Sequence, residues 1–133
     1  MKIEEHEKAY KEHFNNIKKA IEEGIEENQR NIGYNISQGS VELFAIYLHK
    51  LHFLQGSGDQ IDHRIFKSDN LIRKKLPYEF PSKAKILSLM KSIELERNAL
   101  CYGNRKLKNR ISKSIKDFHE LRKIINDNLK SEI

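Results

Sequence analysis

The chain has 133 residues and a mass of 15.7 kDa, which is the size of a single domain. Hydrophobic residues make up 38% of it and charged residues 33%, so the sequence is globular and polar rather than disordered. The longest apolar stretch, Val41 to Leu54, contains charged and histidine side chains and is shorter than the roughly 18 residues of a membrane span. The single cysteine excludes an internal disulfide. No basic-then-apolar leader is present, so we expect a cytoplasmic protein.

The formal net charge of +6 is unevenly distributed. Residues 1–30 carry six basic and eight acidic side chains, residues 31–104 carry ten and seven, and residues 105–133 carry nine and four. This basic segment begins with Arg105, Lys106, Lys108, Arg110 and Lys113. Such a patch attracts phosphate backbones or an acidic partner, but a solvated helix face in a lysine-rich protein has the same composition.

The N-terminal segment predicts a long amphipathic helix from Ile3 to Gln29. Its apolar side chains recur at spacings of seven, four and three, which places them on one stripe of a helix. The stripe consists of Ile3, Tyr10, Phe14, Ile17, Ile21 and Ile25. Gly33 indicates a break, and residues 37–40 indicate a turn that leads to a helix cap.

The stretch Val41 to Leu54 predicts a helix of a different kind, because it has almost no polar face. A helix that is apolar nearly all round is buried on most sides, so we expect it at the centre of the fold. The residues that follow, Gln55 to Asp59, are rich in glycine and serine and predict a loop.

The second half of the chain predicts three further helices. The first runs from Asp62 to Leu76 and is followed by a rigid connector between Pro77 and Pro81. Ser82 is a suitable cap for the next helix, which runs to about Cys101, and the last helix spans Asn109 to Leu129. Residues 1–133 therefore predict one all-α domain, an antiparallel bundle of four to five helices around a central buried helix.

Arg97 stands out in the helix that ends near Cys101. It lies four residues after Ile93 and three before Leu100, so it points with the apolar stripe. A buried arginine needs a partner, because an unpaired buried charge is very costly. Glu94, three residues earlier, is one candidate. The alternative is an anion such as phosphate, whose oxygens match the planar guanidinium.

The segment from Glu94 to Gly103 resembles the signature of the HEPN superfamily. In that family an Arg-Asn pair near a helix end is followed by a few apolar residues and then His-Gly; here the pair is Arg97-Asn98. The resemblance implies an all-helical domain that forms a homodimer and brings two arginine motifs together across an RNA-binding cleft. It also implies metal-independent ribonuclease chemistry in which Arg97 stabilises phosphate charge and Asn98 helps to position the site.

Tyr102 stands where the family has histidine. An unperturbed phenol has a pKa of about 10, whereas a proton-transfer group works best when its pKa is near the operating pH. Tyr102 is suited to donating a hydrogen bond or stacking on a base, so it is the weaker member of the catalytic pair. We therefore expect RNA binding with weak or no cleavage. Arg105, Lys106 and Lys108 would supply long-range attraction to the phosphates.

The histidines offer few alternatives. His63 follows the glycine-rich stretch and is the one we consider as a substitute for the missing motif histidine. His49 and His52 are three residues apart but lack a third ligand at suitable spacing, so we predict no metal site. The remaining histidines are predicted to be helix-surface or boundary residues: His6, His13 and His119. Cys101 lies at a helix C-terminus, where the helix dipole disfavours a thiolate.

The residues around Gly56 match no nucleotide fingerprint, so we predict no cofactor. Three functional hypotheses follow. The first is a HEPN-like homodimer that binds RNA or another phosphate-bearing ligand. The second is a protein-interaction module that docks on a partner, such as the nucleotidyltransferases encoded with many HEPN proteins. The third retains catalysis and uses His63 or Tyr102 in place of the motif histidine.

Overall fold

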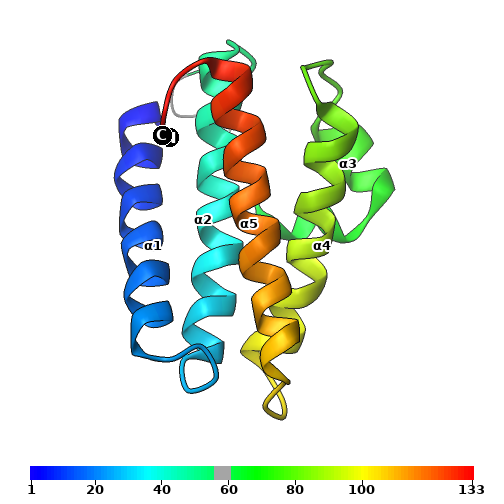
Figure 1. Cartoon of the computed structure of the whole chain (residues 1–133). Helices are drawn as coiled ribbons and strands as arrows, with labels where there is room; N and C mark the ends of the chain where they lie inside the picture. Colours follow the sequence, from blue (N-terminus) through cyan, green and yellow to red (C-terminus); the bar gives the residue numbers. More distant parts are fainter. Residues whose placement is uncertain (56–60) are drawn as a thin grey trace.

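The structure is a computed structural model that describes residues 1–55 and 61–133, and these residues form helices and turns without a strand. The α-helices are α1 (Ile3–Glu23), α2 (Gln29–Lys50), α3 (Asp69–Lys75), α4 (Lys83–Cys101) and α5 (Lys108–Leu129), and a 3-10 helix, η1 (His63–Lys67), precedes α3. The four long helices run alternately down and up the molecule (Figure 1). This arrangement confirms the predicted all-α antiparallel bundle of four to five helices.

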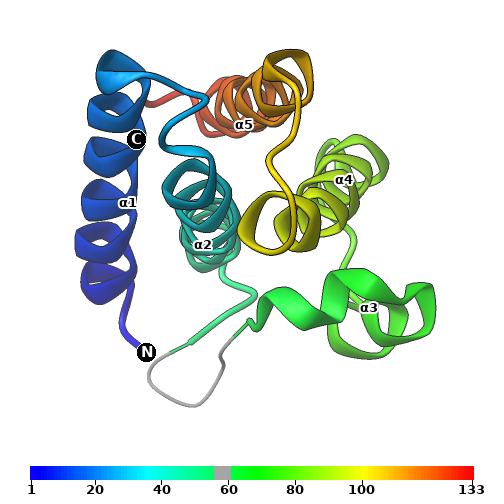
Figure 2. The ribbon, with the colours of Figure 1, turned by 90° about the horizontal axis from the view of Figure 1, so that it is seen from below.

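Helix α2 occupies the centre of the bundle. Figure 2 shows it between α1, α4 and α5, and it contacts all three as well as η1. The side chains from Leu43 to Leu48 are completely buried, as expected for a helix with apolar residues on every face. The predicted central helix is therefore confirmed, but it begins at Gln29, twelve residues earlier than Val41, and ends at Lys50.

The predicted break at Gly33 and the predicted turn at residues 37–40 are wrong, because both lie inside α2. Small residues serve close packing there. A Cβ added to Gly33 would lie 2.6 Å from the Cβ of Leu100 on α4, and one added to Gly39 would lie 3.2 Å from the Cβ of His13 on α1. Glycine thus allows the neighbouring helices to approach α2, and the resulting burial outweighs the low helix propensity of glycine.

The N-terminal helix is shorter than predicted. It ends at Glu23 rather than Gln29, because Gly24 has a φ of 126°, a backbone conformation that favours glycine. The N–H of Gly24 donates to the carbonyl of Ala20 and closes the last turn. Ile25 therefore belongs to the loop between α1 and α2, where it still packs against the core.

The helix predicted from Asp62 to Leu76 is divided into η1 and α3. Ser68 has extended backbone angles, and its Oγ accepts a hydrogen bond from the N–H of Leu71, so this residue caps α3 instead of continuing η1. Asp62 caps η1 in the same way, since its Oδ1 accepts from the N–H of Arg64 at 2.8 Å. Of the loop predicted at residues 55–59, all but Gln55 lies outside the described residues.

The connector from Pro77 to Pro81 is non-helical as predicted, and α4 follows Ser82. Ser82 makes no capping hydrogen bond, however; its φ is 62°, and its Oγ accepts from Asn128 Nδ2 on α5 at 3.1 Å. The last helix starts at Lys108, one residue before the predicted start. No described helix is both long and apolar enough to cross a membrane.

Candidate phosphate-binding surface

Arg97 lies on the side of α4 that faces α2 and is half-buried. Its Nη1 donates a hydrogen bond to Ser37 Oγ at 3.0 Å, and its Cζ lies 5.4 Å from the ring centroid of Tyr34. Both partners belong to α2, and Ser37 is buried while the Tyr34 ring is 47% exposed. A hydroxyl and an aromatic face therefore hold the guanidinium at the edge of the solvent.

Within the described residues, Arg97 forms no ion pair with a carboxylate. Glu94, the partner considered from the sequence, faces the other way: its Oε2 lies 2.9 Å from His63 Nδ1, and its Oε1 lies 4.0 Å from Lys67 Nζ. The predicted alternative of a Glu94–Arg97 pair is thus wrong in this structure. His63 contacts the same carboxylate and is held on the η1 side of α4, away from the Ser37 contact.

The end of α4 is fastened to the start of α2. Arg30 donates through Nη1 to the carbonyl of Cys101 at 2.6 Å and through Nη2 to that of Gly103 at 2.8 Å. These bonds satisfy carbonyls that a helix C-terminus leaves without intrahelical donors. Gly103 has a φ of 78°, a backbone conformation that favours glycine and turns the chain away from the end of α4.

A buried amide reinforces this junction. Gln29 is fully buried; its Nε2 donates to the carbonyl of Leu100 at 2.9 Å, and its Oε1 accepts from the N–H of Lys106 at 2.6 Å. Arg105 Nη1 donates to the carbonyl of Glu26 at 3.0 Å. The α1–α2 and α4–α5 loops, which lie at the same end of the bundle in Figure 1, are therefore held together by side chains.

The predicted ligand-binding residues do not all lie together. Asn98 lines a cavity of about 760 Å³ between α3 and α4, whereas Arg97 makes its contact with Ser37 on α2. Lys108 lies in a shallow depression on the outer face of α5 with Lys113 and Lys116. Tyr102 is 65% exposed just after α4. Arg97, Asn98 and Lys108 therefore do not line one common site, and the contacts of Arg97 come from α2.

Cys101 is half-buried near Arg97 and Arg30. Burial raises the pKa of its thiol above the ordinary value, and this effect outweighs the opposing influence of Arg97 and Arg30. The thiol therefore stays protonated at neutral pH, which agrees with the predicted absence of a thiolate nucleophile.

Three residues of this surface were not predicted from the sequence: Arg30, Tyr34 and Ser37, which occupy one stripe of α2 at spacings of four and three. That periodicity was available in the sequence, but the expected break at Gly33 concealed it. His13 was also assigned to an ordinary helix surface. Its ring centroid lies 6.0 Å from that of Tyr34 in an edge-to-face arrangement, so it belongs to the surroundings of Arg97.

The two histidines considered as metal ligands are placed at the end of α2, His49 inside the helix and His52 just beyond it. Across residues 1–55 and 61–133, no group of three or more histidine, cysteine, aspartate or glutamate side chains is arranged to hold a metal ion. His6 is buried against α2, and its Nδ1 is hydrogen-bonded to Glu42 Oε2 at 2.5 Å, so the prediction of a helix-surface or boundary position is wrong for this residue.

Comparisons with known proteins add no relative: no family model, no curated protein and no solved structure matches this chain.

Proposed function

We propose that this chain is a HEPN-like homodimeric domain that binds RNA or another phosphate-bearing ligand at a surface centred on Arg97. The observation that carries the proposal is that the Arg97 guanidinium is held in place and still has no anionic partner in the described part of the chain. Its guanidinium is oriented by Ser37 Oγ and the Tyr34 ring, and within the described residues it has no carboxylate partner. A fixed guanidinium has five N–H donors, of which Ser37 uses one, so a phosphate can engage the planar fork with two bonds.

The neighbouring arginines support the same ligand. Arg30 and Arg105 donate to backbone carbonyls and form no ion pair within the part of the chain that the structure describes. Their positive charges are therefore not neutralised locally. The exposed rings of Tyr34 and Tyr102 offer flat faces on which the bases of a single strand can stack. Unpaired guanidinium groups combined with exposed aromatic rings favour single-stranded RNA over a compact anion.

The proposal includes weak or no metal-independent ribonuclease activity. Tyr102 stands where the HEPN pattern has histidine, and His63 is bonded to Glu94 rather than directed at Arg97. We expect wild-type protein in EDTA to leave a labelled RNA intact, and Tyr102→His to gain cleavage that the added substitution Arg97→Ala removes. Cleavage by the wild type that is lost in Tyr102→Phe or His63→Ala would instead establish an active enzyme.

Fluorescence anisotropy with a labelled single-stranded RNA tests the binding site. We expect Arg97→Ala to weaken binding by roughly ten- to a hundredfold, because a charge-assisted contact to phosphate is lost. Arg97→Lys keeps the charge but loses the fork and the stacking on Tyr34, so it should bind with intermediate affinity.

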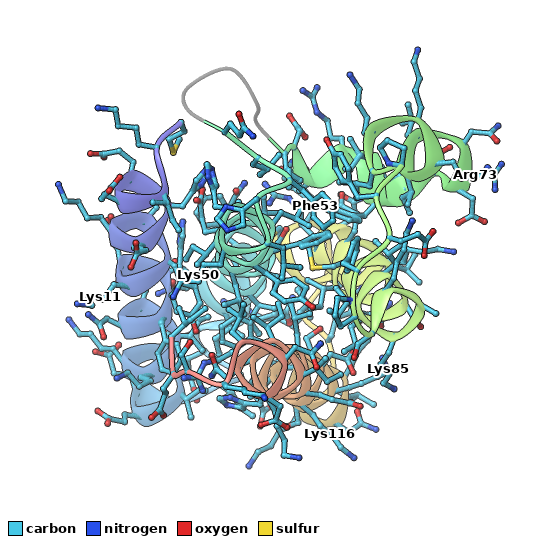
Figure 3. All side chains as sticks on the ribbon, turned by 90° about the horizontal axis from the view of Figure 1, so that it is seen from above. Lys11, Lys50, Phe53, Arg73, Lys85 and Lys116 are labelled. Atoms are coloured by element: carbon cyan, nitrogen blue, oxygen red, sulfur yellow. The ribbon has the colours of Figure 1, made fainter. Side chains whose placement is uncertain are left out.

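Arg73→Ala is the matched control for that titration. Arg73 lies on α3, on the opposite side of the molecule from α1 (Figure 3), and within the described residues its side chain is hydrogen-bonded only to Asn70. The control removes the same unit of charge and should change the affinity by less than about threefold. Equal losses in Arg97→Ala and Arg73→Ala would mean that net charge alone attracts the RNA and that Arg97 forms no site.

A protein-interaction module is the second candidate, and two exposed leucines favour it. Leu95 on α4 is 72% exposed, and Leu107 before α5 is 77% exposed. Exposed apolar side chains of this kind can pack against a protein partner, which would be a second copy of the chain or a nucleotidyltransferase-like protein in the cytoplasm. Light scattering should give twice the chain mass for a dimer. A monomer that does not bind RNA but forms a stable complex with such a partner would favour the second candidate.

A further inference from the structure

One exposed aromatic ring, that of Tyr34, is contacted by side chains from two other helices. Arg97 from α4 lies over it, and His13 from α1 packs against it with an interplanar angle of 69°. Figure 2 shows α2 between α1 and α4, which explains how both reach the same residue. We call His13, Tyr34 and Arg97 the Tyr34 surface.

The imidazole of His13 is held in one orientation. Its Nδ1 lies 2.8 Å from Asn35 Oδ1. The amide orientation of Asn35 follows from its contacts with Asn31, since its Nδ2 donates to the backbone carbonyl of that residue at 2.9 Å and also to its Oδ1. Asn35 Oδ1 can only accept, so the neutral imidazole carries its proton on Nδ1 and has its lone pair on Nε2.

The support for this imidazole is buried. Asn35 is 4% exposed, and its Oδ1 also accepts from Asn16 Nδ2 at 3.3 Å. An amide inside the protein requires hydrogen-bond partners to offset its desolvation, and here the partners fix a histidine at the solvent edge. No donor among the described residues is hydrogen-bonded to His13 Nε2, so this nitrogen is an oriented acceptor beside Tyr34.

The three groups of the Tyr34 surface differ in what they recognise. The Arg97 guanidinium suits a phosphate, the exposed Tyr34 ring suits a base or a sugar face, and His13 Nε2 requires a hydrogen-bond donor. The ribose 2′-hydroxyl is a donor that lies between phosphate and base, and it is the group that distinguishes RNA from DNA.

We propose that His13 is a specificity-determining residue whose Nε2 accepts a hydrogen bond from the ribose 2′-hydroxyl of a nucleotide held by Arg97. The Tyr34 surface then selects RNA over DNA of the same sequence. This inference rests on the proposed function and assigns its sugar specificity to α1, a helix outside the motif segment.

The test measures anisotropy of labelled single-stranded RNA and DNA that share one sequence of A, C and G. Wild type should bind the RNA more tightly. His13→Ala should weaken RNA binding by about two- to tenfold, the value of one hydrogen bond, and change DNA binding by less than about twofold. Alanine retains the Cβ that packs near Gly39, so circular dichroism and the unfolding midpoint should verify the fold.

Two further variants complete the design. His13→Phe keeps an aromatic ring against Tyr34 without nitrogen acceptors and should lose the RNA preference as His13→Ala does. His119→Ala on α5, an exposed helix histidine, should keep the wild-type ratio of RNA to DNA affinity.

The outcomes separate the two proposals. An Arg97→Ala variant that binds both strands more weakly, combined with His13 variants that keep the wild-type RNA-to-DNA ratio, would overturn the role of His13 alone. Equal loss of RNA and DNA binding in the His13 variants would overturn it as well. No loss in Arg97→Ala would overturn the proposed function and this inference with it.

Discussion

Glu96 and Arg97 are consecutive residues of α4, yet their charges are compensated very differently. Glu96 is buried against α5, and its Oε2 accepts from Arg110 Nε at 2.8 Å. Glu94, one half-turn earlier, pairs with His63 on η1. Arg97 faces α2, where its guanidinium contacts the hydroxyl of Ser37 and the ring of Tyr34. It pairs with no carboxylate of the described residues.

Glu94 and Glu96 carry charges that are paired within the fold, whereas the charge of Arg97 is available to a ligand. A buried carboxylate without a cation is costly, so the partners of Glu94 and Glu96 stabilise the fold. Arg97 is half-buried and keeps access to water, so its charge can persist without a partner. Substitutions on the η1 and α5 sides of α4 should therefore act on stability, and those on the α2 side should act on binding.

The largest stability effect is expected at His63. His63→Ala leaves Glu94, which is 3% exposed, with only the half-exposed Lys67 at 4.0 Å. We expect the free energy of unfolding in urea to fall by about 2 kcal/mol, the cost of an unsatisfied buried acceptor. Adding Glu94→Gln should recover part of the loss. An unchanged urea midpoint in His63→Ala would mean that the Glu94 contact is not structural.

Gly33→Ala should produce the next largest loss. The new Cβ meets the Cβ of Leu100 at 2.6 Å, which belongs to the rigid part of that side chain, so α2 and α4 must separate. Overpacking costs about 1–3 kcal/mol and exceeds the roughly 1 kcal/mol gained in helix propensity. Gly39→Ala, with a 3.2 Å contact, serves as the control and should lose less. A stabilised Gly33→Ala protein in thermal unfolding would contradict the close packing.

The third expectation compares Arg97 with Arg110. Arg97→Ala should lower the free energy of unfolding by less than about 1 kcal/mol, because the half-buried guanidinium loses only one hydrogen bond to a neutral hydroxyl and its contact with the Tyr34 ring. Arg110→Ala should lower the unfolding midpoint more, since Glu96 then loses the guanidinium with which it is paired. The reverse order would make Arg97 a structural residue and remove the basis of the comparison.

The smallest effect concerns pH and His119 on α5. Partial desolvation of the imidazole, followed by the proximity of Arg122, lowers the pKa of His119 in the folded state, although the residue lies on the exposed face of α5. The unfolded chain then binds more protons than the folded one below about pH 6.5, so this contribution to stability is present above that pH and lost as the pH falls through the folded pKa. His119→Gln should reduce the loss of urea stability between pH 7.5 and pH 5.5. An identical pH dependence in wild type and variant would contradict the shift.

The fold was predictable from the sequence where apolar periodicity dominates. The last helix was placed to within one residue at its start, and α2 was correctly expected at the centre, because long amphipathic or fully apolar segments have few alternative structures. The errors arose at small and polar residues. Gly33 and residues 37–40 have the composition of a turn, and only the approach of α4 to Gly33 and of α1 to Gly39 shows why they are helical.

The candidate site was predictable in part. Arg97 was singled out because a charge lay within an apolar stripe, and the structure does place it against another helix. Its partners Tyr34 and Ser37 depend on the packing of α2 against α4, and the role of Asn35 in orienting His13 depends on the packing of α1. Spacing along the chain does not encode such contacts between helices, so those residues required the structure.

The salt dependence of RNA binding is the most direct test of Arg97 as a phosphate-binding residue. Each phosphate contact to a single strand contributes roughly 0.7 to the slope of log Kd against log salt concentration. We predict that Arg97→Ala lowers this slope by about that amount, while Arg110→Ala, whose charge is paired with Glu96, leaves it close to wild type. Identical slopes for wild type and Arg97→Ala, or an equal decrease in both variants, would contradict the assignment of Arg97 as the phosphate-binding residue.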